Sequence, residues 1–129
     1  MKCTALLMQD HQVILRALDV LDQMAVRVAN DQSVEANDVE TLVRFLRVFA
    51  DDHHQAKEES ALFPEMIRAS DVNNEPLRQM IFEHDQERSL VEGLEDALYT
   101  KKGSEFVHFA TRLTSLIRTH IDQEDKILF

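Results

Sequence analysis

Residues 53–65 of this chain read HHQAKEESALFPE, and residues 120–129 read HIDQEDKILF, so one short pattern is written twice. In both copies a histidine is followed four residues later by a glutamate. On a helix this spacing places the two side chains on one face, one turn apart. The alignment pairs His54 with His120, Glu58 with Glu124, Glu59 with Asp125, Leu62 with Leu128 and Phe63 with Phe129. Two helices are therefore predicted to carry equivalent sets of polar groups.

The composition favours helices throughout the chain. Only two glycines and two prolines occur in 129 residues, so there is little material for tight turns. Leu, Ala, Glu, Gln and Arg are abundant, and these residues have high helix propensity. We expect an all-α protein.

Four helical stretches follow from apolar residues at spacings of three, four and seven. They span about residues 4–29, 37–68, 76–100 and 104–129, with polar breaks between them. Asn37 or Asp38 is a candidate N-cap for the second stretch, and Gly103 is a candidate left-handed cap after the third. Short links between helices of this length predict an up-down-up-down antiparallel four-helix bundle, formed by residues 1–129 as a single domain.

The other two helices also contribute histidines. His11 lies in a DHQ sequence and His84 in an EHD sequence. His11 and His84 lie about 19 and 17 residues before the ends of their helices, whereas His54 and His120 lie about 16 residues after the starts of theirs, and a rise of about 1.5 Å per residue brings all four to one level. The chain is therefore predicted to gather four histidines and two glutamates, Glu58 and Glu124, at one height in the bundle.

Six such groups in a core require a counter-charge, because unpaired buried ionisable groups are costly. Metal cations would supply it. Four imidazoles and two carboxylates are too many ligands for one tetrahedral ion, and they suit two ions of higher coordination. Each ion would take two histidines, and both glutamates would bridge. Nitrogen and oxygen ligands without thiolate favour iron or manganese, and zinc could also occupy such a site. The alternative is a metal-free bundle with hydrogen-bonded polar layers.

Other classes of protein fit the sequence poorly. The net charge is −10, whereas a nucleic-acid surface needs clustered Lys and Arg. There is no apolar run long enough for a membrane span. The single cysteine, Cys3, fits a reducing compartment, so we expect a cytoplasmic protein. Two Glu-x-x-His motifs, typical of ferritin-like sites, are absent, because Glu105 and His108 form the one such pair. His108 is expected at the surface.

Together, the DHQ, HQAKEESALFP, EHDQER and HIDQEDKILF segments resemble the hemerythrin-like domain, also called the HHE cation-binding domain, from His11 to Phe129. This resemblance implies a four-helix bundle that holds a non-haem di-iron centre. The two iron ions would be joined by an oxo, hydroxo or water bridge and would bind oxygen or, in some members, nitric oxide. It implies these metal ligands: His11, His54, His84, His120, and the bridging Glu58 and Glu124.

The sequence departs from the oxygen-carrying hemerythrins on the third helix. Those proteins carry a second histidine four residues after the first, whereas Arg88 occupies that position here. Water, a small ligand or Glu87 could take the vacant place. Two further alternatives stay open: Asp125 could replace Glu124 as a ligand, and His53, nearer the apolar stripe by α-helical angle, could replace His54. Asp125, Glu59 and His53 are otherwise expected around the ligands rather than among them.

Three functions remain from the sequence. The first is binding of oxygen or nitric oxide for sensing, scavenging or storage. The second, typical of the four-histidine branch of the family, is donation of iron to repair damaged iron-sulfur centres. An oxidase or peroxidase ranks third, because no substrate pocket is visible in the sequence. The expected partners are a diatomic ligand and either a second copy of the chain or a protein iron acceptor.

Overall fold

The computed structural model describes residues 2–55, 58–59, 64 and 75–125, and the side chains of residues 8–51, 54–55, 58–59, 64 and 78–125. The chain forms α1 (Lys2–Ala29), α2 (Ala36–Phe45), the π-helix η1 (Leu46–Gln55), α4 (Glu75–Thr100) and α5 (Gly103–Gln123). The described residues contain no strand. The expected all-α four-helix fold is confirmed.

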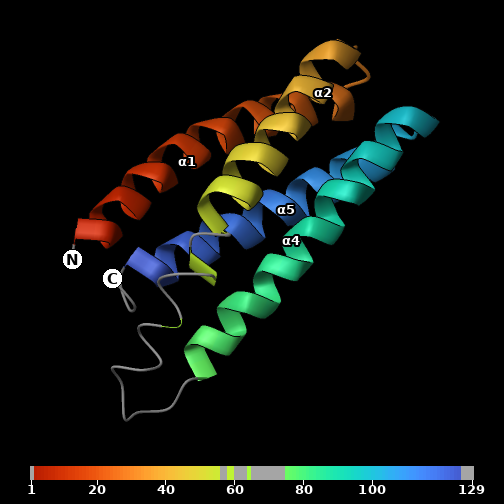
Figure 1. Cartoon of the computed structure of the whole chain (residues 1–129). Coiled ribbons are helices and arrows are strands. Elements are labelled where there is room, and N and C mark those ends of the chain that lie inside the picture. Colours follow the sequence, from red (N-terminus) through yellow and green to blue (C-terminus); the bar gives the residue numbers. More distant parts are fainter. Residues whose placement is uncertain (1, 56–57, 60–63, 65–74, 126–129) are drawn as a thin grey trace.

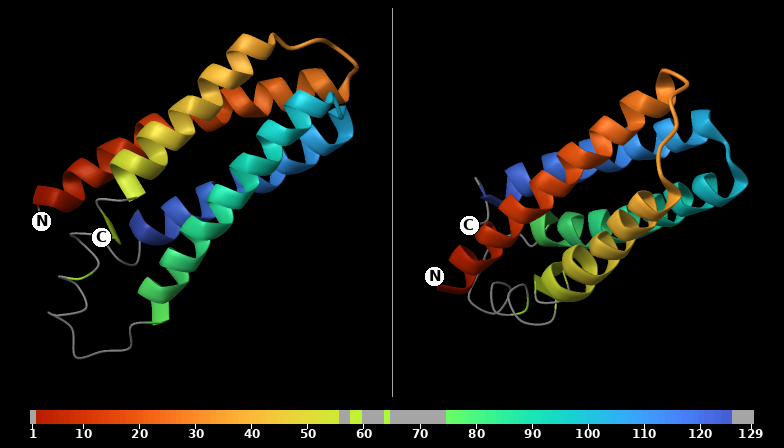
Figure 2. Two further views of the ribbon diagram at one scale, coloured as in Figure 1. Left: turned by 45° about the vertical axis from the view of Figure 1, so that its right-hand side comes forward. Right: turned by 90° about the horizontal axis from the view of Figure 1, so that it is seen from above.

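The helices lie side by side, and α2 continues directly into η1 as one rod (Figure 1). Successive helices run in opposite directions in both views of Figure 2. The α5 helix packs against α1 and α4, while the rod of α2 and η1 packs against α1 and α4 from the other side. Both ends of the chain lie at the same end of the bundle. None of the described helices is long and apolar enough to cross a membrane.

The apolar core follows the helical spacing seen in the sequence. Leu18, Leu21, Leu94 and Leu113 are completely buried at its centre. Each leucine buried in this way stabilises the fold by about 1.5–3 kcal/mol relative to an exposed side chain. Gly93 lets α4 approach α5 closely, because a Cβ atom there would lie 2.6 Å from the Phe109 ring. The contact of Gly93 with Phe109 therefore sets how closely α4 and α5 pack.

The change from α-helix to π-helix at Leu46 alters which residues face the core. One row of buried residues recurs at every fourth position along this rod, at Leu42, Leu46, Ala50 and His54, and Glu58 beyond the rod continues the spacing; Val39, Val43 and Gln55 are buried beside this row. In a regular α-helix this row would turn by about 40° at each step and leave the core face after three or four steps. Hydrogen bonds to the fifth residue along widen the helix, so a four-residue step within η1 falls short of a full turn and offsets the drift of the preceding α-helix. The π-helix thus keeps His54 on the core side, in line with the apolar stripe.

Two expectations about helix ends are wrong. The α2 helix is preceded by Glu35, which makes no capping hydrogen bond with its side chain, so neither Asn37 nor Asp38 is the N-cap. Gly103 is the first residue of α5, and no glycine among the described residues has a positive φ. The predicted end of the second helix near residue 68 and the polar break at residues 69–74 lie outside the described residues.

Two non-glycine residues supply the left-handed conformation instead. Asp31 and Lys101 have φ angles of 59° and 57°. After each of them the next amide donates to the carbonyl five residues earlier, Gln32 to Arg27 at 2.8 Å and Lys102 to Ala97 at 3.1 Å. This is the hydrogen bonding of a Schellman motif, in which glycine is the preferred residue. The α1–α2 and α4–α5 links therefore each contain a residue in a strained conformation.

Replacing Lys101 with glycine is expected to stabilise the protein. The side chain costs about 1–2 kcal/mol in the left-handed region, and part of this is offset by the greater freedom of glycine in the unfolded chain. We expect the free energy of unfolding in urea to rise by about 0.5–1 kcal/mol. Lys102→Gly is the matched control, since Lys102 has a φ of −99° and should gain nothing. An equal gain in both variants would contradict the strain argument.

Candidate metal centre

The structure brings the six predicted site residues together inside the bundle. They come from all four helical rods and from the segment that follows η1. Every one of them is buried, and none is more than 3% exposed. The six are His11 from α1, His54 from η1, Glu58 just beyond it, His84 from α4, His120 from α5 and Glu124 at its C-cap.

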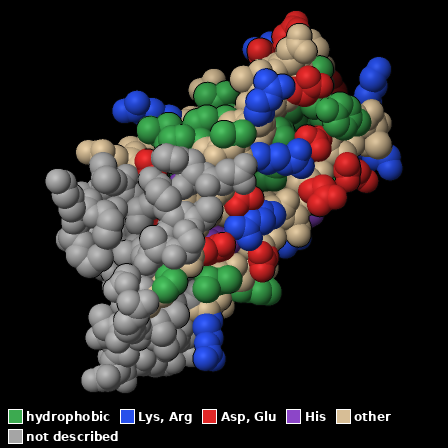
Figure 3. Space-filling model, viewed as in Figure 1, with side chains coloured by type: hydrophobic (Ala, Val, Ile, Leu, Met, Phe, Trp, Pro, Cys, Tyr) green, Lys and Arg blue, Asp and Glu red, His purple; other side chains and the backbone are tan. Residues whose placement is uncertain are grey.

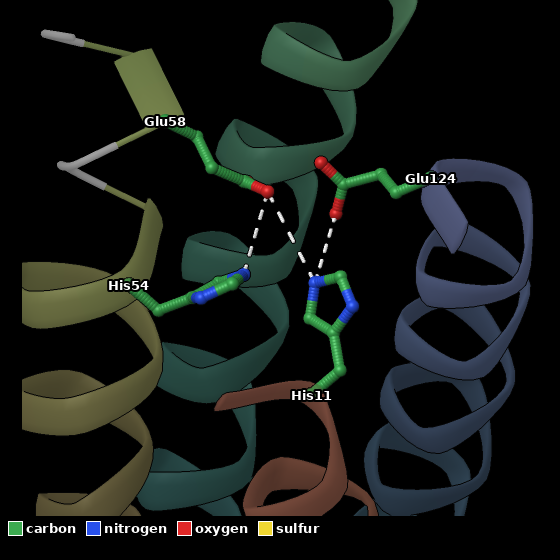
Figure 4. Close-up of side chains that lie close together, drawn as sticks. All are labelled: His11, His54, Glu58 and Glu124. Atoms are coloured by element: carbon green, nitrogen blue, oxygen red, sulfur yellow. Dashed lines mark ion pairs between the residues drawn. The ribbon is translucent and has the colours of Figure 1, made fainter. Parts of the chain in front are cut away.

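The first half of the centre is formed by His11, His54, Glu58 and Glu124 (Figure 4). The Nε2 atom of His11 lies 3.3 Å from Oε1 of Glu124 and 4.0 Å from Oε2 of Glu58. The Nε2 atom of His54 lies 3.4 Å from the same Glu58 oxygen. Figure 4 shows the two imidazoles and the two carboxylates pointing toward one another from different helices.

The second half uses the same two carboxylates with the other two histidines. The Nε2 atom of His84 lies 3.2 Å from Oε1 of Glu58, and the Nε2 atom of His120 lies 3.1 Å from Oε1 of Glu124. The two Nε2 atoms are 3.1 Å apart. In each half the four potential ligand atoms lie within 4.8 Å of one another, and Glu58 and Glu124 belong to both halves. The arrangement therefore has two adjacent places for a cation, with two shared carboxylates.

Each histidine is held from behind by a further carboxylate at its Nδ1 atom. The distances are 2.8 Å for His11 to Asp125, 3.1 Å for His54 to Asp10, 2.8 Å for His84 to Glu59 and 2.8 Å for His120 to Glu83. An ionised carboxylate only accepts hydrogen bonds, so each Nδ1 donates and the Nε2 atom is turned toward the centre. Carboxylates in this position orient a metal-binding imidazole and raise its basicity.

These four supports follow an approximate twofold relation between the halves of the chain. Asp10, on the first helix of its half, holds His54 on the second, and Glu83 holds His120 in the same way. Conversely, the acid that follows each central glutamate reaches across to the other half: Glu59 holds His84, and Asp125 holds His11. The repeat in the sequence thus corresponds to a repeat in the geometry.

The neighbouring carboxylates shift the pKa values of the histidines in the centre. Burial alone would lower the pKa of His120, but Glu124, Glu87 and Glu83 outweigh it and raise that pKa to about 10. Burial also lowers the pKa of His11, yet Glu124 and Asp125 leave it raised. For Glu124, burial would raise the pKa, but the close contacts of its Oε1 with the imidazoles of His11 and His120, at 3.3 and 3.1 Å, outweigh burial and hold that pKa well below its usual range. Protons on the histidines therefore compensate the buried carboxylates where cations would otherwise do so.

The residues fit a pair of cations on two grounds. All four oxygens of Glu58 and Glu124 are buried without a hydrogen-bond partner in the described residues, and such acceptors are costly unless something satisfies them. Neighbouring ligand atoms around an octahedral ion at about 2.1 Å are about 3 Å apart, and opposite ones about 4.2 Å. The observed separations of 3.1–3.4 Å and 4.0 Å match these values. Imidazole and carboxylate ligands suit first-row transition metals.

The sequence alternatives are placed as follows. Asp125 contacts Nδ1 of His11, on the side away from the two halves of the centre, and Glu59 contacts Nδ1 of His84 in the same way. The side chain of His53 and the apolar residues 62–63 and 128–129 lie outside the described residues. His108 is exposed, as expected. Glu87 is 3% exposed but belongs to neither half of the centre.

Arg88, at the position of the missing fifth histidine, turns to the surface. Its guanidinium Nε donates to both oxygens of Asp51, at 2.9 and 3.0 Å, and its Nη1 donates to Asp85 at 2.7 Å. A longer ion pair of 3.4 Å joins it to Glu59. Within the part of the chain that the structure describes, the third helix thus gives the centre one histidine.

Asp10 and Glu83 are the supporting residues that sequence reasoning missed. The signal for both was present, because an acid directly precedes the histidine in both the DHQ and EHD segments. Their roles depend on which histidine of the neighbouring helix they reach, and the sequence alone does not give that registry.

The fold and the centre define a class of protein: an α-helical bundle whose buried histidines and carboxylates can hold metal cations. A family model described as the hemerythrin HHE cation-binding domain matches residues 4–129. The chain therefore belongs to the hemerythrin HHE cation-binding domain family. No curated protein and no solved structure matches it.

Removing one supporting carboxylate is expected to weaken metal binding. Asp10→Asn and Glu83→Gln should each lower the affinity for a divalent cation about 10- to 100-fold, because the imidazole behind which they lie becomes less basic and less well oriented. The measurement is competition against a chromophoric chelator. Glu92→Gln, at an exposed position on the same helix as Glu83, is the control. If the control and Glu83→Gln bound equally well, the supporting role would be refuted.

Proposed function

We propose that this protein holds two iron ions and binds a small diatomic molecule, oxygen or nitric oxide, for sensing, scavenging or storage. The observation that carries the proposal is the sharing of Glu58 and Glu124 between two adjacent groups of four ligands. Two bridging carboxylates hold a pair of metal ions close together, and paired iron ions can supply the electrons that binding or reducing such a molecule requires. The family match supports cation binding by the chain.

The ligand count supports room for an added molecule. Each half of the centre offers two histidines and two shared carboxylates, which is four protein ligands. An octahedral ion has six positions, so positions remain for water or for a small ligand. The outward direction of Arg88, with its bonds to Asp51 and Asp85, leaves the place of a fifth histidine unfilled by that residue.

The chain's own residues would fix the geometry of binding. His54 and His120 are each oriented by a carboxylate on the neighbouring helix, and Glu58 and Glu124 lie beside them at 3.4 and 3.1 Å. Burial of all six residues keeps bulk water from the centre. A preorganised, dry site of this kind favours ligands that are small and carry little charge.

The same low ligand count supports a second candidate, which is donation of iron to damaged iron-sulfur centres. An ion held by four protein ligands exchanges more readily than one held by five or six. In this case partner proteins would receive the iron. In ligand binding the iron stays in the protein, whereas in donation the iron leaves it.

A homodimer is a further proposed assembly, and sedimentation would test it.

The first experiment loads the purified protein with iron anaerobically and records metal content and the near-ultraviolet spectrum. We expect two iron ions per chain and a spectral change when nitric oxide or azide is added. Glu58→Ala and Glu124→Ala should each lower the iron content or abolish the band, since each carboxylate serves both ions. Glu92→Ala should behave as wild type. Retention of both ions by the two centre variants would refute the bridging roles.

The second experiment separates donation from ligand binding. The iron-loaded protein is mixed with an apo iron-sulfur acceptor, and transfer is followed by the spectrum of the acceptor. Donation requires transfer within minutes and loss of iron to a moderate chelator. Iron that withstands prolonged chelation, together with a response to nitric oxide, would support binding and exclude donation.

A further inference from the structure

A small pocket lies beside the centre, between η1, α4 and α5. It has a volume of about 60 Å³ and opens to the surface on one side. The α2–η1 rod supplies one wall, α4 the other and α5 the floor. The apolar lining consists of Leu46, Ala50, Val91 and Ile117. Since a water needs only about 10–15 Å³ of such space, the pocket has room for a molecule of a few atoms.

The inner end of the pocket touches the surroundings of the centre. Gln55, which lines it, directly follows His54 in the sequence, and Glu87 lies one turn after His84. The Oε1 atom of Glu87 is 4.0 Å from Nδ1 of His120. The pocket therefore leads from the surface to residues that adjoin three of the four histidines.

The polar pair at this end has unused hydrogen-bonding capacity. Gln55 and Glu87 are 6% and 3% exposed, and the amide of Gln55 donates to Oε2 of Glu87. The Oε1 atom of each is buried and accepts no hydrogen bond from the described residues. A buried acceptor left in this way costs about 1–3 kcal/mol. A small molecule that enters the pocket would meet these two oxygens before it reached the metal ligands.

The outer rim is formed by paired charges. Arg88 on α4 bonds to Asp51 on η1 across the mouth, and Arg47 bonds to Glu95 at 2.8 Å. Figure 3 shows basic side chains interleaved with acidic ones on the face over α2 and α4. Arg47 is 45% exposed and can leave its partner at little cost, because surface ion pairs contribute about 0–1 kcal/mol.

We propose that this pocket is the passage by which a small uncharged molecule reaches the metal centre, with the Gln55–Glu87 pair at its inner end and the arginine ion pairs at its rim. Apolar walls exclude hydrated ions, and the inner acceptor oxygens disfavour anions. The inference rests on the proposed ligand-binding function and specifies the route and the kind of ligand.

The test follows nitric oxide binding to the iron-loaded protein by stopped-flow absorption. Ala50→Phe places a ring in the pocket, and we expect the association rate to fall about tenfold or more while iron content stays unchanged. Arg47→Ala opens the rim, and we expect a faster rate. Arg88 is left intact, because it also contacts Glu59, which holds His84.

One further variant serves as a control, and another replaces Ala50→Phe if that variant does not fold. Ala29→Phe makes the same substitution in a groove between α1 and α5, away from the passage, and should bind nitric oxide at the wild-type rate. If Ala50→Phe fails to fold, the milder Ala50→Leu takes its place and should slow binding less. In all variants, iron content and the spectrum before mixing must match wild type.

The outcomes separate the route from the function. Wild-type association rates in Ala50→Phe or Ala50→Leu and in Arg47→Ala, with iron retained, would overturn the passage and leave ligand binding standing. An iron-loaded wild type that does not respond to nitric oxide would overturn both. Opposite shifts in the two kinds of variant, with no change in Ala29→Phe, would establish the route.

Discussion

Two completely buried carboxylates, Glu58 and Glu124, are the constraint on which the rest of this structure depends. Removing an ionised carboxylate from water costs several kcal/mol unless opposite charge and hydrogen bonds compensate. Four imidazoles surround the pair at 3.1–4.0 Å, and the pKa values of His11, His84 and His120 are raised. The same imidazoles can hold protons or, once these leave, metal ions.

The apolar core and the histidine–carboxylate centre lie in different halves of the bundle. On α1 and α4, most of the buried apolar residues come after His11 and His84. On the α2–η1 rod and α5, most of them come before His54 and His120. The apolar core therefore lies toward the end of the bundle that carries the α1–α2 and α4–α5 links. Leu18, Leu94 and Leu113 are completely buried there. Packing in that half fixes the registry of the helices, since filled cores allow few alternative arrangements. The polar half can then keep its costly carboxylates at fixed positions, supported by Asp10, Glu59, Glu83 and Asp125.

The repeat and the matched heights of the histidines were sufficient to predict which six side chains meet. Helical rise and short links convert sequence spacing directly into position, so this part of the site was accessible from the sequence. The α-helical angle that favoured His53 did not apply, because the rod is a π-helix from Leu46 to Gln55, whereas the four-residue spacing to Glu58 correctly favoured His54. That widening depends on packing against other helices. The left-handed residue Lys101 and the reach of Asp10 to His54 likewise depend on how neighbouring helices meet.

Arg88 shows how a single position can change what the centre is able to do. A guanidinium is always charged and cannot bind a metal, so this residue has no favourable place among the ligands. It instead reaches the surface, joins Asp51 and Asp85, and lies 3.4 Å from Glu59. Glu59 in turn holds His84, so Arg88 contacts the carboxylate that lies behind a histidine of the centre. On this side of the centre, Glu87 and Gln55 line the pocket, and the Oε1 atom of each is buried without a hydrogen-bond partner among the described residues.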